Sequence, residues 1–309
     1  MISICIPIYN YYAYPLVRRL VNQIEQYGAQ EQVEVICIDD HSSGYYLNQN
    51  MGICDIATYL RLAENIGRSR IRNLFLKYAK GDWLLFLDND ALVVDKYIKE
   101  CLKYQNARAD VVFGGTSYDR RGDDVQYRLR YLYGTREEVC DVEQRTQSPY
   151  RHLWVNNMMI RRSVFERIKF DPRISTYGYE DMLFVYRLET GNVSVLHVDN
   201  PIVHGHLESN AEYLQKVIQS SKTLAAIYNM MWEDQRFCHS IPLLESYSKI
   251  QRWKQVGLFY SLFKIFKTPI ESHLTSGRFS SLRQLHLYKL GILIRELHYN
   301  NSTDNTETK

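Results

Sequence analysis

The segment LLFLDND at residues 84–90 decides the fold class, because a strongly apolar run ends there in two carboxylates. Trp83–Leu87 is short and almost wholly apolar, which is typical of a buried strand. Asp88 and Asp90 follow directly, and such a pair supplies oxygen ligands for a hard divalent cation while leaving room for phosphate oxygens. A bare pair of this kind more often caps a helix or solvates a turn. The neighbouring segments therefore decide how it is interpreted.

Strand and helix patterns alternate on the N-terminal side of this segment. Ile2–Ile8, Val33–Ile38 and Thr58–Leu62 have the composition of short buried strands. A stretch with apolar residues three and four positions apart follows the first strand and ends at Gly28, and Arg68–Tyr78 predicts a second helix. This alternation predicts an α/β fold with a mostly parallel sheet.

The remainder of the chain divides into two parts by pattern. Further apolar segments are expected at Asp110–Gly115, Leu153–Ile160 and Val193–His197. A charged, loop-rich stretch is expected at 119–147, and a helix is expected to begin at Arg162. Beyond about Ser209 the periodicity is helical. We therefore expect a catalytic domain at residues 1–208, a helical C-terminal extension at 209–299 and a disordered polar tail at 300–309.

Polar residues follow three of the predicted strands. They gather around Tyr9, around Asp40 and around Asp88. Ligands of open α/β sheets bind beyond the carboxyl ends of the strands. We therefore expect these three clusters to converge on one site.

Composition and charge exclude several classes of protein. The net charge of +3, from 38 basic and 35 acidic residues, is too balanced for a nucleic-acid binder. The six cysteines show no CxxC spacing, which favours free thiols in a reducing compartment. No apolar run approaches the roughly 20 residues that span a bilayer, and the first residues lack the basic region of a signal peptide. We expect a cytoplasmic protein, either soluble or peripheral at the inner face of the cell membrane.

Five segments, in order and spacing, resemble the inverting glycosyltransferases of family 2. They are ICIPIYN at 4–10, VICIDDHSS at 35–43, NIGRSRIRN at 65–73, LLFLDND at 84–90 and YGYEDMLFVYRL at 177–188. Each is a weak signal alone, but five in the right order are difficult to attribute to chance. The resemblance implies a GT-A fold, that is, a Rossmann-like mixed sheet flanked by helices, which binds a nucleotide-diphosphate sugar.

The resemblance also implies which residues hold the donor. Tyr9 would stack on the base, as an aromatic ring does with any base face. Asp40 would accept a hydrogen bond from the base, and Arg72 would either hold the diphosphate or brace the aspartates. A UDP-sugar is favoured. The full set of expected nucleotide-sugar contacts is Pro7, Tyr9, Asn10, Asp39, Asp40, Asn65, Arg72, Asp88 and Asn89.

A divalent cation, Mn²⁺ or Mg²⁺, is the expected cofactor. The resemblance makes Asp90 its main protein ligand, with Asp88 touching the ribose or the metal. His204 is a third candidate ligand, although its neighbour His206 could be mistaken for it. Ala91 lies where many relatives carry another acidic residue, so the expected metal site has one carboxylate ligand fewer.

The base of the reaction is expected at Asp181, with Glu180 as the alternative. An inverting transfer needs a base within reach of the acceptor hydroxyl, and adjacent side chains at a helix start point differently, so one of the two faces the acceptor. Two acids at a helix N-terminus are also explained by the helix dipole alone. Asn156 and Asn157 lie near the donor sugar or acceptor in relatives, or are core strand amides.

The expected function is sugar transfer to an acceptor hydroxyl in bacterial cell-surface polysaccharide or glycan synthesis. The partners are a nucleotide-sugar donor and a glycan or lipid-linked acceptor. Two alternatives stay open: a non-catalytic nucleotide-sugar-binding partner of a synthase, and a DxD phosphatase, which the position of the motif and Leu92 count against. Trp253–Lys267 is amphipathic and either packs on the protein or lies on a membrane surface.

Overall fold

The computed structural model describes residues 1–119, 124–278 and 280–299, so the expected disordered tail at 300–309 lies outside the described residues. The chain divides into two compact units. Unit 1 comprises Met1–Asp119, Thr135–Ser175 and Glu180–His206, and unit 2 comprises Arg120–Gly134, Thr176–Tyr179 and Leu207–Lys309. Two short segments within residues 1–208 thus belong to unit 2, whereas a division at residue 208 was expected.

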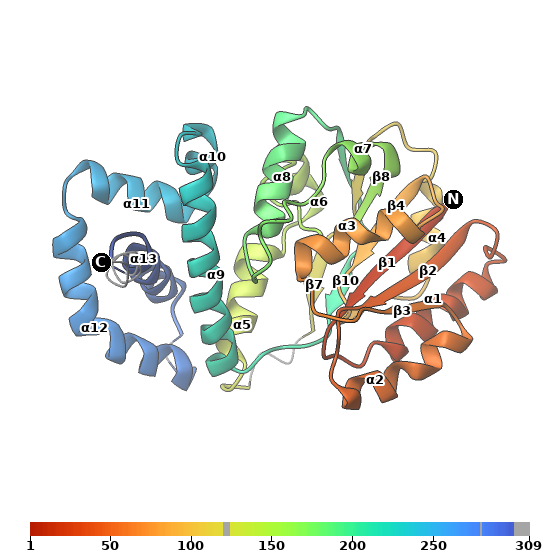
Figure 1. The fold of residues 1–309 in the computed structure, drawn as a ribbon, viewed down its shortest axis with the longest axis horizontal. Helices are drawn as coiled ribbons and strands as arrows, with labels where there is room; N and C mark the ends of the chain where they lie inside the picture. Colours follow the sequence, from red (N-terminus) through yellow and green to blue (C-terminus); the bar gives the residue numbers. More distant parts are fainter. Residues whose placement is uncertain (120–123, 279, 300–309) are drawn as a thin grey trace, which may run out of the picture. The chain divides into compact units, whose positions relative to one another are not determined.

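Unit 1 is built on a seven-stranded sheet with the order β3-β2-β1-β4-β8-β6-β9 (Figure 1). The strands are β1 (Ile2–Ile8), β2 (Val33–Asp39), β3 (Thr58–Arg61), β4 (Trp83–Leu87), β6 (Val111–Phe113), β8 (Asn157–Arg161) and β9 (Val195–His197). Strand β8 alone pairs antiparallel with its neighbours β4 and β6. The sheet is therefore mixed and mostly parallel, as predicted.

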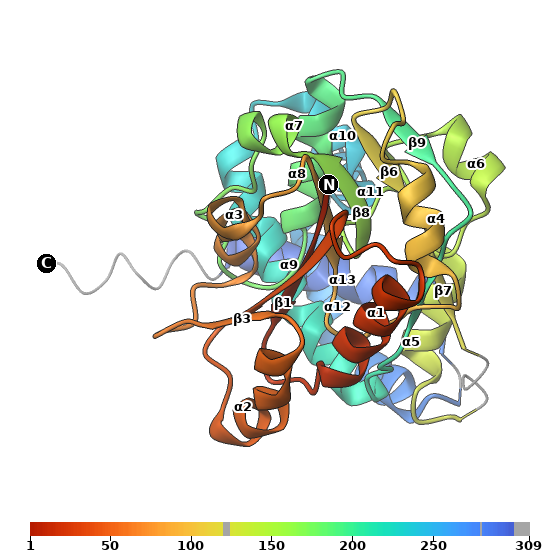
Figure 2. The same cartoon turned by 90° about the vertical axis from the view of Figure 1, so that its right-hand side faces the viewer.

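Helices cover both faces of this sheet, which explains why β1 and β4 are mostly apolar and almost wholly buried. The helices of unit 1 are α1 (Tyr14–Gln26), α2 (Gly44–Asn50), α3 (Arg68–Tyr78), α4 (Tyr97–Lys103), α6 (Val142–Gln147), α7 (Arg162–Arg167) and α8 (Glu180–Thr190), with a 3₁₀ turn at Met51–Asp55. One core cluster joins α1 and α4 to the sheet. The other joins α3, α7 and α8 to the opposite face (Figure 2).

A second, three-stranded sheet in unit 1 has the order β5-β10-β7. Its strands are β5 (Ala91–Leu92), β7 (Thr116–Tyr118) and β10 (Ile202–His204). β10 pairs antiparallel with β5 and parallel with β7. Because β5 begins one residue after Asp90, this small sheet fixes the backbone beside the two aspartates.

The expectation of a loop-rich stretch at 119–147 is wrong for its described part. It contains α5 (Arg128–Tyr133), a π-helical turn (Gly134–Glu138) and α6. Leu129 of α5 is fully buried in the apolar cluster of unit 2. α6 begins at Asp141, whose carboxylate accepts the Gln144 N–H and so caps the helix. The many charged side chains conceal these short elements because each buries only one or two residues.

Unit 2 is helical, as predicted for the C-terminal extension. Besides α5, its helices in the described residues are α9 (Asn210–Met231), α10 (Gln235–Ser240), α11 (Pro242–Arg252), α12 (Val256–Ser276) and α13 (Leu282–His298). Within this unit α13 lies between α9, α11 and α12 (Figure 1). Ser209 and Glu212 form a reciprocal capping box that starts α9. None of the helices in the described ranges has the length and apolar character needed to cross a bilayer.

Candidate functional site

The site of unit 1 lies at the carboxyl ends of β1, β2 and β4. These three strands are parallel, so their ends meet at one edge of the sheet. At this edge the Asn10 N–H donates to Ser42 Oγ over 2.9 Å, and the Ser43 N–H donates to Asn10 Oδ1 over 2.9 Å. The loops after β1 and β2 are thereby joined. The predicted convergence of the first two polar clusters is present.

Tyr9 stands at this junction with its side chain free to meet a ligand. It is 53 % exposed, although the residues before it in β1 are buried. Pro7 is half-buried within the strand. An exposed ring beside the two joined loops is suited to stacking on a base. The role of Tyr9 stays a prediction.

Asp39 and Asp40 are both buried, and both are hydrogen-bonded inside the protein. Asp39 accepts from the Ser42 N–H at 2.6 Å and from the Tyr59 hydroxyl at 2.8 Å. Asp40 accepts from two backbone N–H groups, those of Ile66 at 2.7 Å and Gly67 at 3.0 Å. Burial raises the pKa of the Asp40 carboxyl above its ordinary value, although these backbone bonds act in the opposite direction. Asp40 therefore holds the loop that leads into α3.

The loop before α3 needs its glycine. Gly67 has a φ of +82°, and a Cβ there would lie 2.5 Å from the Ser175 carbonyl oxygen. Asn65 donates from its side chain to the Asp40 carbonyl oxygen at 3.1 Å. These contacts set where α3 begins, and hence where its arginines lie.

The aspartates after β4 lie beside His204. Asp90 Oδ2 and His204 Nδ1 are 3.6 Å apart. They meet because His204 of β10 pairs with Ala91 of β5, and the Gly205 N–H donates to the Asp90 carbonyl oxygen at 2.9 Å. Asp88, Asn89 and Asp90 are all half-buried. The carboxylate and the imidazole nitrogen are a donor set that suits Mn²⁺.

A closed metal site made by protein alone is not formed here. In the parts of the chain that the structure describes, no group of three or more His, Cys, Asp and Glu side chains is arranged to hold a metal ion. Asp88 points to Arg72 instead, as described below. A cation bound by Asp90 and His204 would therefore take its remaining ligands from a diphosphate and water, which is how Mg²⁺ is usually held in phosphate sites.

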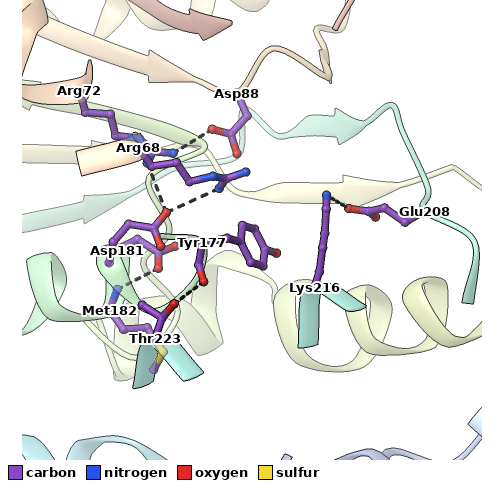
Figure 3. A network of polar contacts seen from close by, with 10 residues as sticks. Arg68, Arg72, Asp88, Tyr177, Asp181, Met182, Glu208, Lys216 and Thr223 are labelled. Carbon is purple, nitrogen blue, oxygen red and sulfur yellow. Dashed lines mark hydrogen bonds and ion pairs between the residues drawn. The ribbon is translucent and has the colours of Figure 1, made fainter. Parts of the chain in front are cut away.

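Arg72 connects the first aspartate to the acidic pair of α8. Its Nη2 lies 3.1 Å from Asp88 Oδ1 (Figure 3). Its Nη1 lies 3.4 Å from Glu180 Oε1. Arg72 is 4 % exposed and stacks over the Phe170 ring, with 5.4 Å between Cζ and the ring centroid. Arg68, one turn earlier, approaches Glu180 Oε1 at 3.6 Å. Of the two roles predicted for Arg72, bracing the aspartates is the one its contacts display.

Glu180 and Asp181 are adjacent at the start of α8 but differ in surroundings. Glu180 is buried against two arginines. Asp181 is half-buried and accepts the Met182 N–H at 3.0 Å (Figure 3). Burial, followed by the negative charge of Glu180, raises the pKa of the Asp181 carboxyl from its ordinary value of 3.8, while Arg72 and Arg68 lower it. Of the pair, Asp181 has the properties of a proton acceptor, and Glu180 those of a positioning group.

Asn157 is a core amide. Its Nδ2 donates to the carbonyl oxygens of Gly115 and Asn200 at 2.8 and 2.9 Å, and its Oδ1 accepts from the Tyr97 hydroxyl at 2.6 Å. Asn156 pairs with the Thr116 hydroxyl. The hydrogen-bonding groups of Asn157 are thus occupied by the protein.

Two tyrosines near Asp90 and His204 were not singled out from the sequence. Tyr11 packs edge-on against His206 at 6.0 Å, and burial together with the charge of Asp90 raises the pKa of its hydroxyl. The Tyr118 ring lies 5.3 Å from the His204 ring. The run of tyrosines after β1 was a signal for Tyr11, whereas Tyr118 lies in a strand too short to recognise.

Comparisons with known proteins agree with this architecture. EpsH of Bacillus subtilis is 22 % identical over 229 residues, which cover 71 % of this chain and 65 % of EpsH. The poly(ribitol-phosphate) beta-N-acetylglucosaminyltransferase TarP of Staphylococcus aureus is 24 % identical over 200 residues, covering 63 % of this chain and 59 % of TarP. The chain thus spans less than two thirds of the length of these two relatives.

The fold is that of GT-A glycosyltransferases, as expected. The mannosyltransferase PcManGT from Pyrobaculum calidifontis, solved in complex with GDP-Man and Mn²⁺, superposes with a TM-score of 0.54 at 13 % identity, covering 96 % of this chain and 87 % of PcManGT. The sequence model described as glycosyl transferase family 2 matches residues 3–169. That match includes all three strand ends of the site and more than half of the 309 residues, and on this ground the chain belongs to glycosyl transferase family 2.

Proposed function

We propose that the protein transfers a sugar from a nucleoside-diphosphate sugar to an acceptor hydroxyl with inversion at the anomeric carbon. A UDP-sugar is the favoured donor. The observation that carries the proposal is the link made by Arg72, which contacts Asp88 of the aspartate pair and Glu180 beside Asp181. The Arg72 guanidinium thus contacts both the aspartate pair expected to bind the donor and the glutamate next to the proposed base.

Asp181 acts as the base in this proposal. It removes the proton of the acceptor hydroxyl as the oxygen attacks the anomeric carbon opposite the leaving nucleotide. A base works best when its pKa lies near the working pH, and the upward pKa shift of Asp181 is in that direction. Glu180 holds Arg72 and Arg68 through its carboxylate and raises the pKa of Asp181 through its charge.

The donor binds at the joined ends of β1 and β2 and beside the aspartates. Tyr9 stacks on the base, and the loop held by Asp40 borders it. Asp90 and His204 would hold a divalent cation, Mn²⁺ or Mg²⁺, which when bound neutralises charge on the departing diphosphate. Asp88 Oδ1 is held by Arg72, and the second oxygen of this carboxylate would contact the ribose or the same cation.

The biological context proposed is bacterial cell-surface polysaccharide or glycan synthesis in the cytoplasm, with a glycan or lipid-linked acceptor. The likeness to TarP, named for transfer to poly(ribitol phosphate), supports an acceptor of the cell envelope. The six free cysteines support a reducing compartment.

The test is donor binding and slow donor hydrolysis with UDP-, GDP- and dTDP-sugars in Mn²⁺, Mg²⁺ or EDTA. We expect one nucleotide class to stabilise the protein against heat and to be hydrolysed, and EDTA to abolish both effects. Binding without any hydrolysis or transfer would favour the non-catalytic partner instead. No binding of any nucleotide sugar would overturn the proposal.

A further inference from the structure

Helix α12 carries apolar side chains on two different sides. On one side Phe263 and Leu274 are buried in the core cluster of unit 2, where they meet Tyr288 of α13. On another side four large apolar residues are largely exposed: Leu258 at 62 %, Leu262 at 48 %, Ile265 at 68 % and Phe266 at 54 %. Packing against unit 2 accounts for the first set and leaves the second in solvent.

The exposed residues form one continuous face. Their spacing along the chain is four, three and one residues, which places side chains on a single side of a helix. The positions are 258, 262, 265 and 266. The four helical residues Leu258, Leu262, Ile265 and Phe266 are called the outer face of α12, and Trp253, 69 % exposed, is the aromatic residue that precedes the helix. A contiguous apolar surface of this kind marks an interaction site.

The segment that carries the outer face is rich in basic residues. From Lys249 to Ile270 the sequence contains five basic residues and no acidic residue. Two of the five pair within their own helices, Lys249 with Glu245 and Lys267 with Glu271. Arg252, Lys254 and Lys264 are exposed. The stretch of chain around the outer face therefore exposes three basic side chains and has a net positive charge.

We propose that the outer face of α12 binds the surface of an anionic phospholipid bilayer. Aromatic and aliphatic side chains on one face of a helix, bordered by lysines, are the composition that lies in the headgroup region of a membrane. Lysine and arginine side chains near such a surface gain attraction from acidic lipids. The helix lies on the bilayer and does not cross it, since none of the described helices is apolar enough to span it.

The charge pattern disfavours a second copy of the chain as the occupant. In a two-fold contact the same surface faces itself. Such a contact would bring Lys254 and Lys264 of one copy against the same basic residues of the other, which costs free energy. An acidic bilayer supplies the opposite charge. The proposal concerns unit 2 and stands independently of the donor chemistry proposed for unit 1.

The experiment is flotation of the full chain with phosphatidylcholine vesicles, with or without phosphatidylglycerol. We expect the chain to float with the mixed vesicles, to float much less with phosphatidylcholine alone, and to be released by high salt. Ile265→Ser with Phe266→Ser removes two exposed apolar side chains and is expected to lower partitioning by more than about tenfold. Lys264→Glu is expected to lower it by about tenfold or more on the acidic vesicles.

A matched control uses the two exposed tryptophans of unit 2. Trp253→Ser should weaken flotation, whereas Trp232→Ser, at a residue 55 % exposed after α9, should not. All variants alter exposed side chains, so circular dichroism and thermal unfolding should match the unaltered chain. Donor hydrolysis in solution, measured on the same samples, should be unchanged, which separates this proposal from the proposed function.

Results of two kinds, from flotation and from sedimentation, would overturn the proposal. One is absence of flotation of the unaltered chain with acidic vesicles, or equal flotation of the chain and the Ile265→Ser, Phe266→Ser variant. The other is a concentration-dependent dimer in sedimentation velocity that the same variant abolishes. The second result would assign the outer face to another copy of the chain.

Discussion

Arg72 Nη1 lies 3.4 Å from Oε1 of Glu180, although 108 positions separate the two residues in the sequence. Both side chains are almost fully buried, at 5 and 3 % exposure. Removing one partner of a buried pair leaves the other charge without compensation. The stability of unit 1 therefore depends on this contact, which also fixes the position of Glu180 beside Asp181.

The first prediction concerns this pair. Arg72→Met should lower the free energy of unfolding by about 3 kcal/mol, because the buried Glu180 carboxylate loses the nearer of its two arginine partners. Glu180→Gln in the same chain should restore part of the loss. Urea unfolding of the two single variants and the double variant gives the coupling energy. If the losses of unfolding free energy of the two single variants simply add in the double variant, the contact is contradicted. If the double variant regains stability but transfers sugar slowly, the pair positions the site as well as stabilising the fold.

The second prediction assigns the base. Asp181→Asn should lower kcat for transfer by about a thousandfold and leave the Kd for the donor unchanged. Asp95→Asn is the control, since its side chain is 94 % exposed. Full transfer by Asp181→Asn would remove Asp181 from the mechanism.

The same substitution should stabilise the folded chain at neutral pH. The pKa of Asp181 is raised in the folded state, so folding disfavours its charged form. This penalty is absent below the unfolded-state pKa and grows as pH rises through the folded-state pKa. Asp181→Asn should therefore raise Tm at neutral pH and have little effect in acid. A lower Tm at neutral pH would mean that the charged form is not disfavoured.

The pH profile provides a third prediction. The base must be ionised, so kcat should fall as pH drops, with a midpoint above the ordinary range of aspartates. Glu180→Gln removes a negative charge that raises the pKa of Asp181, while burial, which raises it, and the two arginines, which lower it, remain. The midpoint should move to lower pH. An unmoved midpoint would show that another group controls the profile.

The fourth prediction separates two neighbouring histidines. Asp90→Ala and His204→Ala should each weaken Mn²⁺-dependent donor binding by more than about tenfold. His206→Ala should not, because His206 contacts the Tyr11 ring rather than Asp90. Calorimetric titration of Mn²⁺ with UDP distinguishes them. Equal losses for both histidines would contradict the assignment.

The fifth prediction concerns Asp40. Both of its oxygens accept backbone N–H groups, so the amide of Asp40→Asn would turn an N–H toward one of these donors. The loss should be about 2 kcal/mol of unfolding free energy. Asp55→Asn, at an exposed aspartate, is the control. Equal stability of the two variants would show that the loop before α3 does not depend on Asp40.

The sequence predicted the long, sharply bounded elements well. Trp83–Leu87 and Arg68–Tyr78 have in the structure the bounds that were predicted. The strand stands out because its apolar run lies between two aspartates, Asp82 and Asp88, and the helix because Gly67 precedes it and Gly81 follows it. The local sequence pattern is sufficient to locate an element where apolar and polar or glycine residues meet abruptly at its ends.

Short elements and distant contacts could not be predicted in this way. β5 and β10 have two and three residues, too few for a period to be recognised. The expectation that His204 approaches the aspartates therefore rested on the family resemblance. The contact between Arg72 and Glu180 depends on how α3 and α8 pack on the same face of the sheet, which pattern along the chain does not encode.

The pairing of β10 with β5 has a consequence for the order in which the protein is made. When β9 has been synthesised, every strand of the seven-stranded sheet exists, yet Ala91 still lacks its partner at residue 204. The Asp90 carbonyl oxygen also lacks its hydrogen-bond donor, the Gly205 N–H, at this stage. A chain growing on the ribosome can therefore form its main sheet before it can form the edge that holds Asp90 and His204 together.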